Sequence, residues 1–176
     1  MGTIRDEIRQ TRPFDSAADE AVVTLLGTAD RVRTTLSAVT EAHDVTLQQY
    51  NVLRILRGAG PAGLPTLEIA ARMIEHSPGI TRLLDRLEAR GLVRRARCPE
   101  DRRQVLCRAT DKALRVLAAL ERPLAEAIRR SLAPLDAART AELVRLLDAA
   151  RAAAASFRTD AKKRDHEKSE KEKKRR

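Results

Sequence analysis

The sequence is poor in cysteine and in aromatic residues. Its 176 residues include two cysteines, no tryptophan and three aromatic residues, Phe14, Tyr50 and Phe157. The two cysteines, Cys98 and Cys107, cannot form a disulfide framework, and nothing near them has zinc-finger spacing. We therefore expect free thiols and little capacity to stack on a flat aromatic ligand.

The sequence also lacks a long hydrophobic run. No apolar stretch reaches the roughly 18 to 20 residues of a membrane-spanning helix, and residues 1–12 lack the hydrophobic centre of a signal peptide. We expect a cytoplasmic protein with no membrane partner. With 43% hydrophobic residues, the chain is long enough for one compact domain with a real core.

No pattern typical of catalysis is present. The three histidines are scattered, no serine or cysteine has a base and an orienting acid nearby, and there is no glycine-rich phosphate loop. We expect no enzymatic activity, no cofactor and no metal site.

Positive charge is abundant and concentrated. The formal net charge is +10, and residues 72–108 contain ten arginines, no lysine and five acidic residues. Residues 158–176 contain ten lysines or arginines and five acidic residues, without apolar periodicity, which predicts a disordered tail or a frayed helix. Because the planar guanidinium suits phosphate and guanine, this distribution favours a nucleic acid as the partner.

The sequence predicts helices in the first half of the chain. Apolar residues recur every three or four positions from Val22 to Val39, which predicts an amphipathic helix over 16–43 that requires a partner helix. A capping box at Thr46–Gln49 opens a second helix that ends at Gly58. A short third helix is expected from Pro65 to about Glu75. Its buried side is expected to consist of Leu67, Ala70, Ala71 and Ile74.

The clearest helix follows. Ser77 fits an N-cap, Pro78 the first helical position and Gly91 the position after the end. The apolar side consists of Ile80, Leu83, Leu84 and Leu87. The residues left to point outward are Gly79, Thr81, Arg82, Asp85 and Arg86.

The periodicity then changes. Two short alternating segments, 92–95 and 104–107, flank a basic turn, which predicts a β-hairpin. A helix capped at Thr110 follows, and Pro123 is expected to kink or split it. The last helix is expected to run from Asp136 through an alanine-rich stretch to Phe157.

Two short helices, a tight turn and an immediate basic hairpin together predict a winged helix-turn-helix. A helix of this kind fits the major groove, where its first turn reaches base edges, and the hairpin straddles the backbone. The expected fold class is mainly α with a small β-hairpin wing, in which N- and C-terminal helices form a dimerisation region. The partner is then double-stranded DNA.

The sequence resembles the MarR family of winged helix-turn-helix transcriptional regulators. The motifs that carry the resemblance are Gln49–Leu53, Ile80–Glu88, Arg90–Val93 and Glu100–Arg103, and the similarity covers roughly residues 17–155. It implies a homodimer that binds a pseudo-palindromic operator. It also implies a cleft for a small-molecule effector, whose binding releases the operator.

Residue by residue, the resemblance places Pro78, Thr81 and Arg82 on the recognition helix, facing the major groove. Ser77, Gly79 and Arg86 lie beside them, and Arg82 is the first choice for reading a base. In the wing, Asp101 is expected to orient Arg103 as a minor-groove probe, and Arg102 shares that role or holds phosphate. Among the remaining wing arginines, those expected to touch phosphate are Arg94, Arg95 and Arg97.

The effector cleft is expected near Arg33, His43, Tyr50 and the surroundings of Leu114. A redox alternative rests on Cys98, because Arg95, Arg97 and Arg102 would favour its thiolate. Cys107 is expected to be half-buried on a strand.

The expected organisation has five parts. These are an N-terminal arm (1–15), a dimerisation helix (16–45), the winged helix-turn-helix lobe (46–109), the C-terminal dimerisation helices (110–157) and the basic tail (158–176). The favoured hypothesis is a homodimeric, sequence-specific repressor that an effector releases. The alternatives are an architectural, sequence-tolerant nucleic-acid-binding protein, a thiol-responsive regulator, and a protein-interaction module in which DNA binding is vestigial.

Overall fold

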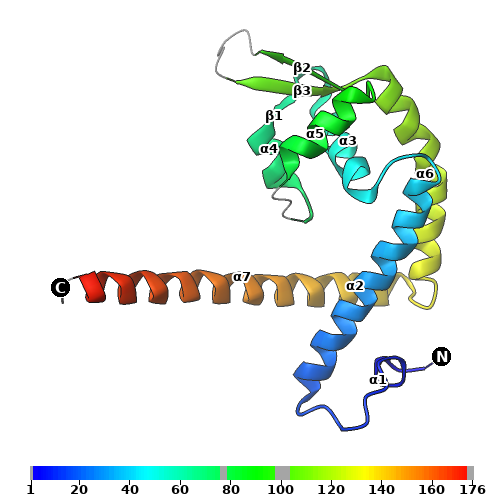
Figure 1. Ribbon diagram of the computed structural model, residues 1–176. Coiled ribbons are helices and arrows are strands. Elements are labelled where there is room, and N and C mark those ends of the chain that lie inside the picture. Colours follow the sequence, from blue (N-terminus) through cyan, green and yellow to red (C-terminus); the bar gives the residue numbers. More distant parts are fainter. Residues whose placement is uncertain (1, 76–78, 98–103, 174–176) are drawn as a thin grey trace. The chain divides into compact units, whose positions relative to one another are not determined.

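The computed structural model describes residues 2–75, 79–97 and 104–173, with side chains described as far as residue 156. It divides into two units, Met1–Ser131 and Leu132–Arg176. The helices of the first unit are α1 (Ile4–Glu7), α2 (Ala17–Glu41), α3 (Leu47–Ala59), α4 (Thr66–Arg72), α5 (Ile80–Ala89) and α6 (Asp111–Ser131) (Figure 1). A 3-10 turn (Gly60–Ala62) and the strands β1 (Leu64–Pro65), β2 (Val93–Arg97) and β3 (Val105–Ala109) complete it.

Side-chain caps fix several helix starts where the sequence predicts them. The Gln49 backbone N–H donates to Thr46 Oγ1 at 3.2 Å, and the Thr46 N–H donates to Gln49 Oε1 at 3.0 Å. Ser16 accepts from the Asp19 N–H at the start of α2, and Thr110 accepts from the Ala113 N–H at the start of α6. These bonds satisfy N–H groups that a helix cannot pair within itself.

The core of the first unit lies between α3, α5, α6 and the sheet. Its largest fully buried side chains include Leu53, Leu56, Ile69, Leu84, Leu87, Leu92, Leu117 and Leu120. Leu36 and Val39, from the C-terminal half of α2, are partly buried against this cluster. The N-terminal half of the same helix leaves Val22, Leu25 and Leu26 exposed.

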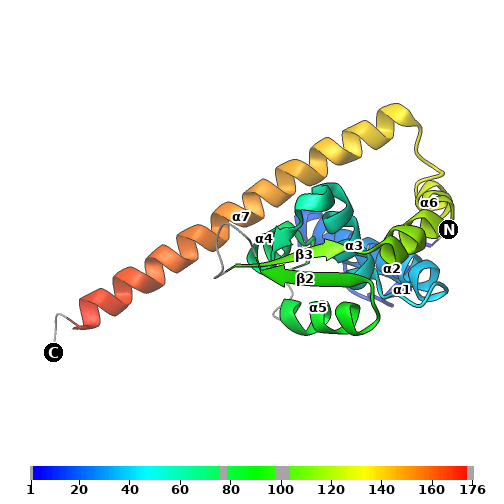
Figure 2. The ribbon, with the colours of Figure 1, turned by 90° about the horizontal axis from the view of Figure 1, so that it is seen from above.

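The strands form an antiparallel sheet in the order β1-β3-β2, with Arg95 opposite Cys107 in the hairpin. Helix α5 packs beside β2, while α3 and α4 pack beside β3 (Figure 2). The two-residue strand β1 is not predicted from the sequence. Gly63 precedes it with φ +72°, and a Cβ there would lie 2.6 Å from the Cys107 carbonyl oxygen, so this close approach requires glycine. The mainly helical fold with a β-hairpin wing is confirmed.

The buried side predicted for α4 is wrong. Leu67 and Ile74 are each 82% exposed, whereas Ile69 and Met73 are buried. In a helix of seven residues both sets have helical spacing, and packing against α3 and β3 selects the second.

The structure also defines the start of α5, the continuity of α6 and a short helix near the N-terminus. The N-cap of α5 is Gly79, whose carbonyl accepts from the Leu83 N–H at 3.0 Å, and the helix begins at Ile80. Helix α6 is not split at Pro123, because Leu120 and Leu124 on either side are both buried and packing holds the helix together. In the N-terminal arm, the short helix α1 packs on α2.

The second unit contains one long helix, α7 (Ala137–Lys173). It continues past Phe157, the end predicted from the sequence, so the described backbone of the basic tail is helical. Alanine-rich sequence has the highest helix propensity, which accounts for continuity through residues 152–155. Among the described residues, no helix combines the length and hydrophobicity that crossing a membrane would require.

Candidate nucleic-acid interface

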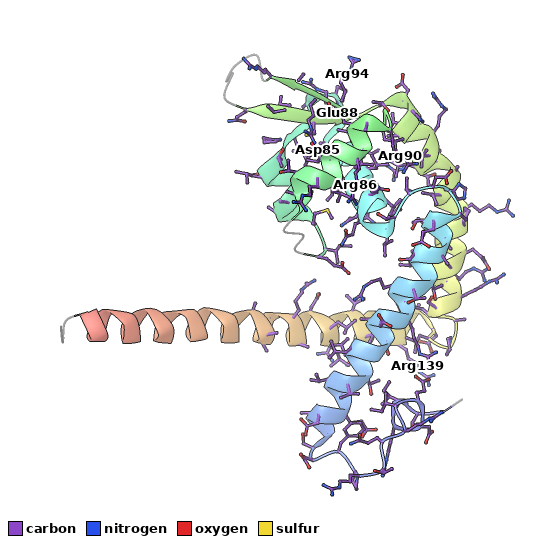
Figure 3. The ribbon with its side chains drawn as sticks, in the orientation of Figure 1. Asp85, Arg86, Glu88, Arg90, Arg94 and Arg139 are labelled. Carbon is purple, nitrogen blue, oxygen red and sulfur yellow. The ribbon has the colours of Figure 1, made fainter. Side chains whose placement is uncertain are left out.

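The outer face of α5 is polar and carries charges of both signs. Because Leu83, Leu84 and Leu87 are buried, the helical period turns Thr81, Arg82, Asp85 and Arg86 outward, and all four are exposed. Figure 3 shows Asp85, Arg86 and Glu88 on this helix. A Cβ at Gly79 would meet nothing within 4 Å, so the start of the helix has open space for an approaching backbone. The sequence predicts this face correctly.

Arg95 ties the hairpin to this helix. Its Nη1 lies 2.7 Å from Asp85 Oδ1, and its Nη2 donates to the Thr81 carbonyl at 3.4 Å. The Arg95 backbone N–H donates to Glu88 Oε1 at 3.1 Å. The Arg95 Nε is buried and lies 3.5 Å from Glu88 Oε2, close enough for charge attraction although no hydrogen bond forms. The guanidinium is therefore engaged along α5.

The electrostatics of this cluster favour the charged form of Arg95. Burial opposes the charge, but the hydrogen bond and charge of Asp85, together with the charge of Glu88, raise the pKa of Arg95 above its ordinary value. Arg95 is predicted from the sequence to touch phosphate, whereas its geometry fits a residue that positions the helix against the hairpin. Asp85 and Glu88, three positions apart on one helix, are the residues that sequence reasoning missed.

The other two arginines of β2, Arg94 and Arg97, differ from Arg95 in their surroundings. Arg94 and Arg97 are exposed on β2, and Figure 3 shows Arg94 on the hairpin. Both remain available to a ligand such as phosphate. Six predicted site residues lie outside the described residues, and they are Ser77, Pro78, Cys98, Asp101, Arg102 and Arg103.

Gly91 fixes the passage from α5 to β2. It adopts φ +67° after the last turn of the helix, as predicted, and its N–H donates to the Glu88 carbonyl at 2.8 Å. Lys112 Nζ donates to the Arg90 carbonyl at 2.9 Å. The hairpin therefore leaves α5 in a defined direction.

A cavity of about 360 Å³ lies within the first unit, between α2, α3, α6 and the segment after α4. Arg33 and Tyr50, two of the residues predicted to lie at an effector cleft, line it. His43 and Leu114 are not among its lining residues, and Leu114 is exposed. Glu75, Leu124 and Ile128 line it as well, and no local sequence signal marks them.

Cys107 is wholly buried rather than half-buried, because β3 is the central strand of the sheet. Burial raises the pKa of its thiol, while the Thr66 side chain and the charge of Arg95 act in the opposite direction. A buried, protonated thiol reacts slowly. In the part of the chain that the structure describes, no three His, Cys, Asp or Glu side chains are grouped to hold a metal ion.

A polar helix held against a basic β-hairpin, at the end of a helix-turn-helix, defines a winged helix-turn-helix protein. Comparison with known proteins agrees. The sequence profile described as "MarR family" matches residues 45–105. A MarR transcription factor from Planctomyces limnophilus is 43% identical, with 77% of this chain and 98% of that one covered at a TM-score of 0.60. The chain belongs to the MarR family.

Two further relatives are informative. PcaV, a transcriptional regulator from Streptomyces coelicolor solved with its natural ligand, is 32% identical over 72% of this chain and 90% of that one, at a TM-score of 0.61. The HTH-type transcriptional regulator TtmR from Methylorubrum extorquens (strain PA1) is 47% identical over 70 residues, 40% of this chain. The chain spans only 35% of TtmR. These relatives are regulators, in agreement with the expectation that the chain is no enzyme.

Proposed function

We propose that the protein is a homodimeric, sequence-specific DNA-binding transcriptional repressor that a small-molecule effector releases from a pseudo-palindromic operator. The observation that carries this proposal is the exposed face of α5, with Thr81, Arg82 and Arg86 turned outward and Arg95 holding the helix to the hairpin. Such a helix fits the major groove of double-stranded DNA. Its place of action is then the cytoplasm.

The proposed DNA contacts are of two kinds, to bases and to phosphates. Arg82 reads a base, and Thr81 and Arg86 lie beside it on the same face. Arg94 and Arg97 hold phosphate, while Arg95 acts by positioning α5. We retain the assignments that sequence resemblance gives to Ser77, Pro78, Gly79, Arg102 and Arg103, with Asp101 orienting Arg103.

The homodimer accounts for apolar surface on both units. Val22 and Leu25, which belong to the apolar seam predicted for α2, are exposed, and so is Leu26 beside them. Val144, Leu146 and Leu147 are exposed on α7. A second copy covering these side chains would remove them from water, which favours association.

The cavity supports an effector site. Its volume lies within the range of small-molecule pockets, and its wall combines aliphatic side chains with a few polar groups. Arg33 and Tyr50 belong to this site.

The test is the affinity of the purified protein for DNA at physiological salt, measured against both a sequence-selected duplex and random duplexes. The proposal predicts a ratio of about 10³ or more. An architectural, sequence-tolerant function, which the net charge of +10 would suit, predicts a ratio near one with a steep salt dependence.

A further inference from the structure

Arg33 and Glu75 join two parts of the first unit that are far apart in sequence. Arg33 Nε, on α2, donates to Glu75 Oε1 at 3.0 Å. Gln48, on α3, has its Nε2 3.5 Å from the other Glu75 oxygen. Glu75 follows α4, which packs against α5, so this ion pair connects α2 to the helix-turn-helix.

Both partners of this pair also line the cavity. The remaining wall is mainly apolar. Five of its side chains are aliphatic, beside Met73 and Tyr50, and they are Leu36, Leu47, Ile74, Leu124 and Ile128. Arg54 lines it too, so the wall carries two guanidinium groups and the single carboxylate of Glu75. The chemistry of the cavity therefore suits a small organic anion with an aliphatic body.

The Arg33–Glu75 ion pair is weak enough for a ligand carboxylate to take the place of Glu75. The side chains of Arg33 and Glu75 are 49% and 46% exposed, and exposed ion pairs contribute little to stability. Asp30 Oδ1 lies 3.3 Å from Arg33 Nη1, so the guanidinium keeps a neighbour of opposite charge when Glu75 leaves. A ligand carboxylate can bind the same guanidinium in two-point geometry while its chain is removed from water.

We propose that the Arg33–Glu75 ion pair is a latch that an aliphatic carboxylate opens. The chain of the ligand fills the apolar cavity, its carboxylate replaces that of Glu75 on Arg33, and Glu75 releases α4, which packs against α5. This inference rests on the proposed function, because operator affinity reports the state of the latch. It adds the ligand class and the contact that transmits binding.

The ligand arm uses octanoate and its neutral isostere octanamide as probes, with isothermal calorimetry on the full chain. The wild type binds octanoate about tenfold more tightly than octanamide. Arg33→Gln removes most of that difference. Glu75→Gln tightens octanoate binding two- to fivefold, because the competing carboxylate is gone.

The DNA arm measures operator affinity of the same variants without ligand. Both Arg33→Gln and Glu75→Gln weaken operator binding two- to fivefold, because each opens the latch. The two variants thus shift octanoate affinity in opposite directions and operator affinity in the same direction. A pocket residue with no latch role would not give this pattern.

Arg31→Gln is the matched control. Arg31 lies on the same helix and pairs with Glu7 at 2.8 Å, away from the cavity, so this variant leaves both affinities unchanged. Equal binding of octanoate and octanamide, or unchanged octanoate affinity in Glu75→Gln, overturns the latch. If selection yields no operator at all, the proposed function fails instead, and the calorimetry still decides what the cavity binds.

Discussion

The guanidinium of Arg95, in β2, lies 2.7 Å from the carboxylate of Asp85, in α5. One ion pair therefore spans the recognition helix and the hairpin, which are the two elements proposed to enter adjacent grooves of DNA. It also explains why an acidic residue lies on a face otherwise suited to a polyanion. Asp85 pairs with Arg95 of the hairpin, and this arginine largely offsets its negative charge.

Breaking this pair is expected to weaken DNA binding without changing which sequence is preferred. Asp85→Asn and Arg95→Gln should each lower the affinity for operator and random DNA, because the helix is no longer fixed against the hairpin. A double-mutant cycle on urea unfolding should give a coupling of about 0.5 to 1 kcal/mol, since Asp85 is 54% exposed and solvent screens the pair.

The control for this cycle is Glu68 and Arg72, a pair four residues apart on α4. Its coupling is expected to stay within about 0.5 kcal/mol, with no change in DNA affinity. Zero coupling between Asp85 and Arg95 would contradict the positioning role.

The exposed apolar seam of α2, which contains Val22 and Leu25, is expected to hold the dimer together. Leu25→Glu places a charge in that seam and should shift the protein toward monomer in sedimentation velocity, with a parallel loss of operator binding. Leu67→Glu, at an exposed leucine of α4, should leave the dimer intact. A wild-type protein that sediments as a monomer would refute the dimeric account.

Cys107 is expected to stabilise the fold only while its thiol is protonated. Its folded-state pKa is raised by burial, so the unfolded chain loses this proton first as the pH rises. The stability difference between the wild type and Cys107→Ala should be constant below the ordinary thiol pKa of about 8.5 and shrink as the pH rises further. Urea unfolding of both proteins across that range is the measurement. Cys98 is present in both proteins, so its own titration cancels from the comparison. A stability difference between wild type and Cys107→Ala that grows at alkaline pH would contradict this assignment.

The basic tail is expected to strengthen binding to every DNA sequence alike. A chain that ends at Ala161 loses nine of the tail's ten lysines and arginines, so its affinity should fall uniformly and its salt dependence should flatten. Titrations with operator and random DNA at several salt concentrations measure both effects. An unchanged salt slope would show that the tail makes no contact with DNA.

Much of the fold is predictable because strong local patterns agree with the tertiary packing. The spacing of Leu83, Leu84 and Leu87 sets which side of α5 is buried, and hence which residues face outward. The capping box at Thr46–Gln49 fixes the start of α3 in the same way. These signals lie within a few residues of one another, so the sequence carries them directly.

The remaining features depend on contacts between distant residues. Arg33 and Glu75 are 42 positions apart, and no local pattern links them. A strand of two residues such as β1 is too short to show alternation. The seven residues of α4 fit two possible buried sides, and only the packing of Ile69 decides between them.

The most direct test of sequence reading by α5 is selection of bound sequences from a random DNA pool, run in parallel with the wild type and Arg82→Ala at physiological salt. The wild type should enrich a two-fold symmetric motif with half-sites about 10 to 10.5 base pairs apart. Arg82→Ala should lose preference at one base pair per half-site, at a cost of about 1 to 3 kcal/mol. Identical motifs from the two proteins, or no motif from the wild type, would contradict the account.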